Sequence, residues 1–180
     1  MTLLTPEIAA LEGTKRVYTA PEPFGAAAGR YFGLAVGDHN PLYSDPGYAR
    51  AQGLADVTAP LTLITETNQY AGLPVNDEGY AGHTWELDVP NTRQVRGGNS
   101  YTFHRRLRPT DVVTATWSID KVISKVNKAG AEMLLINSSA TYTNQAGELL
   151  AENAETIIFV ELTPSRPAAE QAAQKAGEKA

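Results

Sequence analysis

The chain has 180 residues, of which 42% are hydrophobic and 19% charged, and its formal net charge is −5. This length and composition fit one soluble domain with a proper core, and the acidic balance argues against a nucleic-acid partner, which requires a basic surface. The absence of cysteine excludes disulfides, thiolate nucleophiles and thiolate metal ligands. There is no signal-peptide pattern and no apolar run near ~18 residues, so we expect a cytoplasmic protein without a membrane span.

The first part of the chain carries helix signals. Residues 24–37 place apolar side chains at helical spacing, with proline before them and glycine at their end. Asp45 is the expected cap of a short helix over residues 46–53. A further helix is predicted over residues 60–73, where many threonines make it dependent on tertiary burial.

After Gly79 the pattern changes to long runs of β-branched and aromatic residues. The predicted strands are 83–89, 92–107, 112–126, 131–144 and 149–162. Short turn signals between them favour antiparallel connections, and Gly97-Gly98 indicates a bulge. The Ala/Glu/Lys-rich stretch 163–180 is predicted to be a disordered tail, so residues 1–162 form one domain. Helices followed by antiparallel strands give an α+β pattern. A strongly curved sheet around one apolar helix would fit this pattern.

Polar residues crowd the loop that follows the first predicted helix, in the sequence GDHNPLYSD over residues 37–45. This loop resembles the hydratase motif of the MaoC-like family, which includes R-specific enoyl-CoA hydratases and 3-hydroxyacyl-thioester dehydratases. The matching positions are Gly37, Asp38, Asn40, Pro41, Leu42 and Asp45. Residues 56–64 resemble the family's approach to its central helix, and residues 95–111 resemble a strand of the branch similar to type I fatty-acid-synthase dehydratase domains. The resemblance spans about residues 14–162.

The resemblance implies a hot-dog fold, an antiparallel sheet wrapped around a central helix, in a homo- or heterodimer of two such chains. It implies a hydro-lyase of fatty acid metabolism that acts on an acyl-CoA or acyl-carrier-protein substrate without a cofactor. Asp38 would hold the water that adds to or leaves from the β-carbon. Backbone N–H groups of Leu61 and Thr62 would polarise the thioester carbonyl, since Pro60 has no N–H to give.

One position departs from the motif, because Tyr43 stands where the family has its catalytic histidine. A phenol donates a hydrogen bond but is a poor base near neutral pH. Tyr43 is therefore either a proton donor or a wall of the pocket. Asp38 is expected to position water rather than only to brace the loop. Asn40 is a candidate catalytic residue, but a bracing role in the loop is favoured over contact with substrate. His39 lies at a position that the motif leaves free.

Five of the nine arginines fall between residues 93 and 108 without an intervening acid. Arg93, Arg96 and Arg105 are candidates for the phosphates of coenzyme A or a carrier arm, and a charged sheet edge explains them equally well. The spacing of His83 and His104 does not suggest a metal site, and both are expected to be structural.

Three hypotheses follow from these residues. The first is an acyl-thioester hydratase or dehydratase that uses Asp38 to position water. The alternative is a non-catalytic hot-dog subunit that binds the acyl chain and pairs with a catalytic partner, an interpretation that Tyr43 favours. An acyl-thioester hydrolase is a weaker alternative, because that chemistry does not require the Asp-x-Asn-Pro loop.

Overall fold

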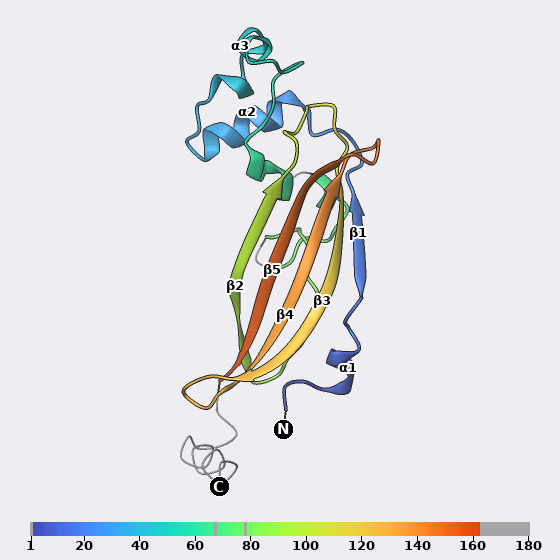
Figure 1. Ribbon diagram of the computed structural model, residues 1–180, viewed down its shortest axis with the longest axis vertical. Coiled ribbons are helices and arrows are strands. Elements are labelled where there is room, and N and C mark those ends of the chain that lie inside the picture. Colours follow the sequence, from blue (N-terminus) through green and yellow to red (C-terminus); the bar gives the residue numbers. More distant parts are fainter. Residues whose placement is uncertain (1, 67, 78, 163–180) are drawn as a thin grey trace.

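A computed structural model of the chain describes residues 2–66, 68–77 and 79–162. These residues form one strongly curved antiparallel sheet, and two helices gather beyond one end of its strands (Figure 1). The strands are β1 (Lys15–Thr19), β2 (Thr92–Phe103), β3 (Thr114–Val126), β4 (Glu132–Thr143) and β5 (Leu149–Glu161). The α-helices are α1 (Pro6–Ala9), α2 (Gly25–Ala35) and α3 (Pro46–Ala51). The 3-10 helices are η1 (Pro41–Tyr43), η2 (Leu61–Glu66) and η3 (Asn68–Tyr70).

The strand order across the sheet is β1-β3-β4-β5-β2, and every pair is antiparallel. Strands β3, β4 and β5 form a meander, because each is joined to the next by a tight turn. Strand β2 pairs with β5 and forms one edge of the sheet. Its register shifts between Arg96 and Gly98, so the predicted bulge at Gly97-Gly98 is confirmed.

The core lies on the inner face of the curved sheet. Alternate residues of the strands are buried there, such as Trp117 on β3 and Leu134 on β4. Leu63, Ile64 and Trp85, from the segment before β2, pack in the same cluster. Each aliphatic side chain of this size stabilises the fold by about 1.5–3 kcal/mol when it is fully buried. Burial of these side chains against the sheet therefore anchors a segment that has little regular structure of its own.

The structure corrects three sequence expectations. The 3-10 helices η2 (Leu61–Glu66) and η3 (Asn68–Tyr70) stand in place of the single helix predicted over residues 60–73, because threonine-rich sequence has weak helix propensity. Residues 83–89 are not a strand: Trp85 and Val89 are buried, but their backbone pairs with no strand in the described sheet. Strand β1 was not predicted, because its five residues are extended only through pairing with β3.

The helix boundaries in the first part agree with the sequence signals. Helix α2 ends just before Gly37, whose φ of +74° reverses the chain in a conformation that suits glycine. The Asp45 carboxylate caps α3 by accepting hydrogen bonds from the N–H groups of Gly47 and Tyr48. Among the described residues no helix has the length and apolarity to cross a bilayer. The predicted tail, residues 163–180, lies outside the described residues.

Candidate functional site

The loop of residues 38–45 is held against the last turns of α2. The Asp38 N–H donates to the Gly33 carbonyl oxygen over 2.8 Å. A methyl group at Gly33 would lie 2.9 Å from the Asp38 carbonyl oxygen and 3.0 Å from Cδ2 of Tyr43. Glycine at this position therefore lets the loop and the Tyr43 ring approach the helix closely.

Side chains of the loop fix its backbone. Asn40 Oδ1 accepts the N–H of Leu42 over 3.0 Å and so caps η1. Oδ1 of Asp38 accepts the N–H of Asn40 over 3.2 Å. The structure therefore gives Asn40 a bracing contact, while the Asp38 carboxylate and His39 are exposed.

Tyr43 and Asp38 are joined directly. The Tyr43 hydroxyl donates to Oδ2 of Asp38 over 2.8 Å, and the tyrosine side chain is buried. Burial raises the pKa of the Tyr43 phenol, the Asp38 carboxylate raises it further, and the Arg106 guanidinium opposes this increase. The phenol therefore remains protonated near neutral pH, where it serves as a hydrogen-bond donor and not as a base.

The segment that leads into η2 is anchored to the same loop. The Thr58 N–H donates to the Leu42 carbonyl over 2.9 Å, and the Thr58 hydroxyl donates to the Leu107 carbonyl over 2.6 Å. A methyl group at Gly29 of α2 would lie 3.0 Å from the Thr58 carbonyl oxygen, so the helix packs tightly on this segment. Leu61 and Thr62 follow as the first residues of η2, where N–H groups have no partner earlier in the helix.

The arginines separate into different environments. Arg105 is 15% exposed and forms a two-pronged ion pair with Asp111, at 3.1 and 2.9 Å, and its Nε lies 2.9 Å from Glu148. Such a largely buried, paired guanidinium braces the fold. Arg96 pairs with the buried Glu155 at 2.9 Å. Arg93 is exposed, on the opposite face of β2 from Arg96.

The histidines are held by other side chains. Nδ1 of His83 lies 3.1 Å from the Tyr18 hydroxyl, and the His83 ring stacks on Trp117 with ring centroids 4.2 Å apart. His104 lies 2.8 Å from Glu152 on an exposed part of the sheet. Within the described part of the chain, His, Asp and Glu side chains form no group of three that could hold a metal ion.

Sequence reasoning did not single out Thr58, Arg106 and Tyr18. Thr58 ties three segments together through its backbone and hydroxyl, and Arg106 influences the pKa of Tyr43. Tyr18 lies on the strand that was not predicted. Thr58 and Arg106 lie in the stretches 56–64 and 95–111 that resemble the family, but the resemblance assigns them no role. The roles of all three residues depend on contacts with residues at least 16 positions away in the chain.

Sequence relatives identify the type of chain. A family model described as "FAS1-like, dehydratase domain region" matches residues 16–153. A UPF0336 protein of Parafrankia sp. (strain EAN1pec) is 31% identical over 154 residues, which cover 84% of this chain and 94% of that protein. A probable enoyl-CoA hydratase alpha subunit of Thermomonospora curvata is 30% identical over 136 residues, 72% of this chain and 43% of that protein.

Solved structures agree on the fold. One chain of the ChsH1-ChsH2 complex from Mycobacterium tuberculosis matches with a TM-score of 0.68 and 22% identity over 89% of both chains. A chain of the HadBC (3R-hydroxyacyl-ACP dehydratase) complex from the same organism matches with a TM-score of 0.58 and 23% sequence identity, and the match covers 82% of this chain and 96% of that one. A MaoC-like dehydratase from Rhodospirillum rubrum matches with a TM-score of 0.58 and 17% sequence identity, and the match covers 87% of this chain and 94% of that one.

At these identities the structural matches establish the fold, and they confirm the hot-dog prediction. The matched region also covers most of the residues on which the sequence resemblance rests. The chain therefore belongs to the family described as FAS1-like, dehydratase domain region, and it has the hot-dog fold.

Proposed function

We propose that this chain is a subunit of an acyl-thioester hydratase or dehydratase, in which a second hot-dog chain supplies the complete acid–base pair. The observation that carries the proposal is the hydrogen bond from Tyr43 to Asp38. Water addition to an enoyl thioester needs a group that accepts and returns a proton near neutral pH. At this position the chain has a protonated phenol, which occupies one oxygen of the carboxylate.

Symmetry strengthens this argument. A homodimer would repeat the same Asp38–Tyr43 arrangement in both halves, so pairing with itself would not restore the missing base. Relatives are named as parts of paired assemblies, among them an alpha subunit, the ChsH1-ChsH2 complex and the HadBC complex. A partner with an intact Asp and His would complete one site, while this chain contributes binding surface.

The thioester would be held through backbone and charge. N–H groups of Leu61 and Thr62, at the start of η2, would donate to the thioester carbonyl, next to a segment anchored by Thr58. Of the three arginine candidates, Arg96 and Arg105 are paired with carboxylates, so the exposed Arg93 is the one we retain for the phosphates of coenzyme A or a carrier arm. Arg93→Glu in the active complex should raise KM for an enoyl-CoA several-fold at low salt with little change in kcat.

A second candidate function is catalysis by this chain alone, with Asp38 positioning the water. The exposure of the Asp38 carboxylate favours it, since substrate and water can reach the oxygen atoms. The two functions give different results for Asp38→Asn in the active complex. If Asp38 positions the water, turnover should fall by roughly 10² or more. If the partner supplies the acid–base pair, turnover should change less than about threefold.

The test of the proposed function begins with isolation of the chain from its native host and a mass measurement of the intact assembly. We expect a second chain of hot-dog size to accompany it. The rate of enoyl-CoA hydration is then measured for the assembly and for the lone chain. A homomeric assembly that hydrates the substrate at a full rate would refute the subunit proposal and support the second candidate.

A further inference from the structure

A cavity of about 610 Å³ lies between the inner face of the sheet and the segment of residues 65–86. It is separate from the contacts around Asp38, which does not line it. Its wall contains six aromatic side chains: Tyr70, Tyr80, Trp85, Tyr101, Trp117 and Tyr142. The only aliphatic side chains in the wall are those of Pro74, Val75 and Ile157, all from described residues. Flat rings therefore form most of its apolar surface.

Contacts between the wall residues hold these rings in place. The Trp117 Nε1–H donates to the Tyr70 hydroxyl over 3.0 Å, and Tyr18 packs edge-on against Tyr70 with centroids 5.2 Å apart. His83 stacks on Trp117 and meets Trp85 edge-on, with centroids 4.2 and 4.5 Å apart. Tyr70, Trp85 and Trp117 are thus held in position, and a ligand would not need to order these three side chains.

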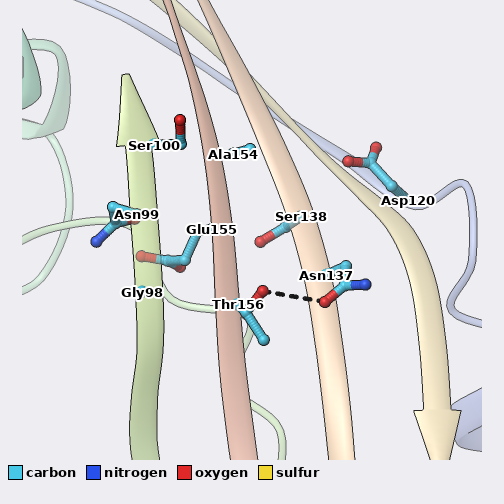
Figure 2. A pocket seen from close by; sticks show the side chains of 9 residues that line it. All are labelled: Gly98, Asn99, Ser100, Asp120, Asn137, Ser138, Ala154, Glu155 and Thr156. Carbon is cyan, nitrogen blue, oxygen red and sulfur yellow. Dashed lines mark hydrogen bonds between the residues drawn. The ribbon is translucent and has the colours of Figure 1, made fainter.

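Polar side chains of the sheet form part of the cavity wall. Glu155 is buried on β5 and pairs with Arg96 of β2, and both line the cavity. Figure 2 shows Glu155 extending toward β2 beside Asn99, with Ser138 in the same row of the sheet. A neighbouring hollow of about 460 Å³ follows this row. The polar row therefore continues across the middle of the sheet.

Several buried polar atoms around the cavity have no hydrogen-bond partner in the described part of the chain. Two belong to wall residues, Nε2 of His83 and Nε1 of Trp85. Two more belong to the adjacent sheet, Oγ of Ser138 and Nδ2 of Asn153. Buried polar groups are nearly always paired, so a cluster of this kind calls for a ligand or water that supplies the missing partners.

Charges around the cavity balance one another. Arg96 pairs with Glu155 at 2.9 Å, and Arg16, whose guanidinium lies 5.9 Å from the centre of the Trp85 ring, pairs with Glu86 at 3.0 Å. His83 carries no charge near neutral pH, because burial, with Arg16 acting in the same direction, lowers its pKa to about 4. An ionised ligand would meet no unpaired opposite charge among these residues.

We propose that this cavity binds an uncharged, ring-bearing group that carries oxygen substituents, rather than a straight alkyl chain. The rings would stack on its flat faces, and its oxygen atoms would meet Arg96, Glu155 and the unpaired nitrogens of the wall. That this group is the acyl part of the thioester substrate rests on the proposed function. Binding of such a group by the cavity does not.

The test uses the full chain and calorimetric titration with three uncharged methyl esters. Methyl 4-hydroxycinnamate has a ring with an oxygen substituent, methyl cinnamate has the ring alone, and methyl 2-decenoate has a straight chain. None is a thioester, so the result does not depend on catalysis. We expect the hydroxylated ester to bind most tightly, with a Kd roughly tenfold or more below that of the straight-chain ester.

Variants place the binding in the cavity. Arg96→Gln should weaken binding of the hydroxylated ester roughly tenfold, because a shorter, neutral amide replaces the guanidinium and leaves Glu155 without its charged partner. Lys121→Gln, an exposed position on β3 with the same change of charge, should alter the Kd less than about twofold. Tyr80→Leu, on an exposed loop residue, removes one ring and keeps the test available if Arg96→Gln does not fold.

Each of the following results would overturn the proposal. One is a straight-chain ester that binds as tightly as the ring esters. Another is equal affinity of the two ring esters, which would remove the role of the oxygen substituent. The third is normal ester binding by folded Arg96→Gln and Tyr80→Leu, or no binding of any ester to the unmodified chain. If the ring esters bind but no assembly of this chain hydrates thioesters, the proposed function fails and the cavity inference stands.

Discussion

The buried phenol of Tyr43 donates a 2.8 Å hydrogen bond to Oδ2 of Asp38, the acid of the hydratase motif. Asp38 is held at three points, since its backbone also bonds to Gly33 and its Oδ1 accepts the N–H of Asn40. The residue in the histidine position of the motif therefore engages the acid directly. This contact predicts both a stability effect and a limit on catalysis.

Tyr43→Phe should lower the free energy of unfolding by about 1 kcal/mol. The change removes a hydrogen bond to a charged acceptor, and the exposure of Asp38 keeps the effect near the lower end of the range for such bonds. Urea denaturation measures it. Tyr48→Phe, on the exposed face of α3, is the matched control and should change stability by less than about 0.5 kcal/mol. Equal effects of the two changes would show that the hydrogen bond contributes nothing.

Gly33→Ala should destabilise the chain by about 1–3 kcal/mol. The added methyl group would lie 2.9 Å from the Asp38 carbonyl oxygen and 3.0 Å from the Tyr43 ring, so the loop has to move. Thermal unfolding gives the size of the effect. Gly72→Ala adds a methyl group with no atom within 4 Å and should be neutral or slightly stabilising. A neutral Gly33→Ala would mean that the loop is not packed on α2 as described.

Much of the fold could be predicted from the sequence, because the signals were local. The four long strands β2 to β5 are rich in β-branched residues and are separated by turn residues, and the caps at Gly37 and Asp45 have direct backbone reasons. Strand β1 could not be predicted, since pairing with β3 makes it extended. Residues 83–89 have the sequence pattern of a strand, because Trp85 and Val89 alternate with polar residues, but these side chains pack into the core without a strand partner in the described sheet.

The site was only partly predictable, because several of its contacts join residues that lie far apart in the sequence. The motif located Asp38 and the departure at Tyr43, but the bond between them depends on how Gly33 admits the ring. Arg105 forms an ion pair with Asp111 because the chain turns after β2. In the sequence, Arg105 is only one member of a cluster of arginines. The aromatic cavity brings together residues from four strands and a long loop, so no local pattern marks it.

Arg105→Gln should cost about 3 kcal/mol of stability, because it leaves the buried Asp111 carboxylate without its guanidinium partner. Denaturant unfolding of the two proteins gives the difference. The control is Arg93→Gln, which changes an exposed arginine of the same sequence cluster and should alter stability by less than about 0.5 kcal/mol. A small effect of Arg105→Gln would return this arginine to the set of phosphate-binding candidates.

His83 should make stability depend on pH below neutrality. Burial lowers its pKa from 6.5 to about 4 in the folded chain, so below pH 6.5 the unfolded chain takes up the proton more readily. The contribution is complete above pH 6.5 and is lost as the pH falls toward 4. Allowing for partial solvent access, the loss is about 1–2 kcal/mol.

His83→Gln should remove this part of the pH dependence, which unfolding curves between pH 7 and 4.5 would show relative to the unmodified chain. His39→Gln, at an exposed loop position, is the control for loss of a histidine and should change stability at pH 7 by less than about 0.5 kcal/mol. Identical profiles for His83→Gln and the unmodified chain would mean that His83 is not held neutral by its surroundings.

Tyr43→His tests whether an imidazole at this position restores the missing base. An imidazole next to Asp38 can accept and return a proton near pH 7, so the lone variant should hydrate an enoyl-CoA at least tenfold faster than the unmodified lone chain. Tyr43→Phe, which lacks both phenol and imidazole, is the control and should show no gain. A Tyr43→His variant that folds but gains nothing would place the limit on activity elsewhere in the site.

The most direct test of the account is the rate at which the purified lone chain hydrates crotonyl-CoA or a longer enoyl-CoA, followed by loss of the enoyl absorbance. With a protonated Tyr43 phenol bonded to Asp38, we predict a rate at least roughly 10² below that of the assembly isolated from the native host. A lone chain that matches the rate of the native assembly would contradict the account and would assign the acid–base chemistry to this chain's own residues.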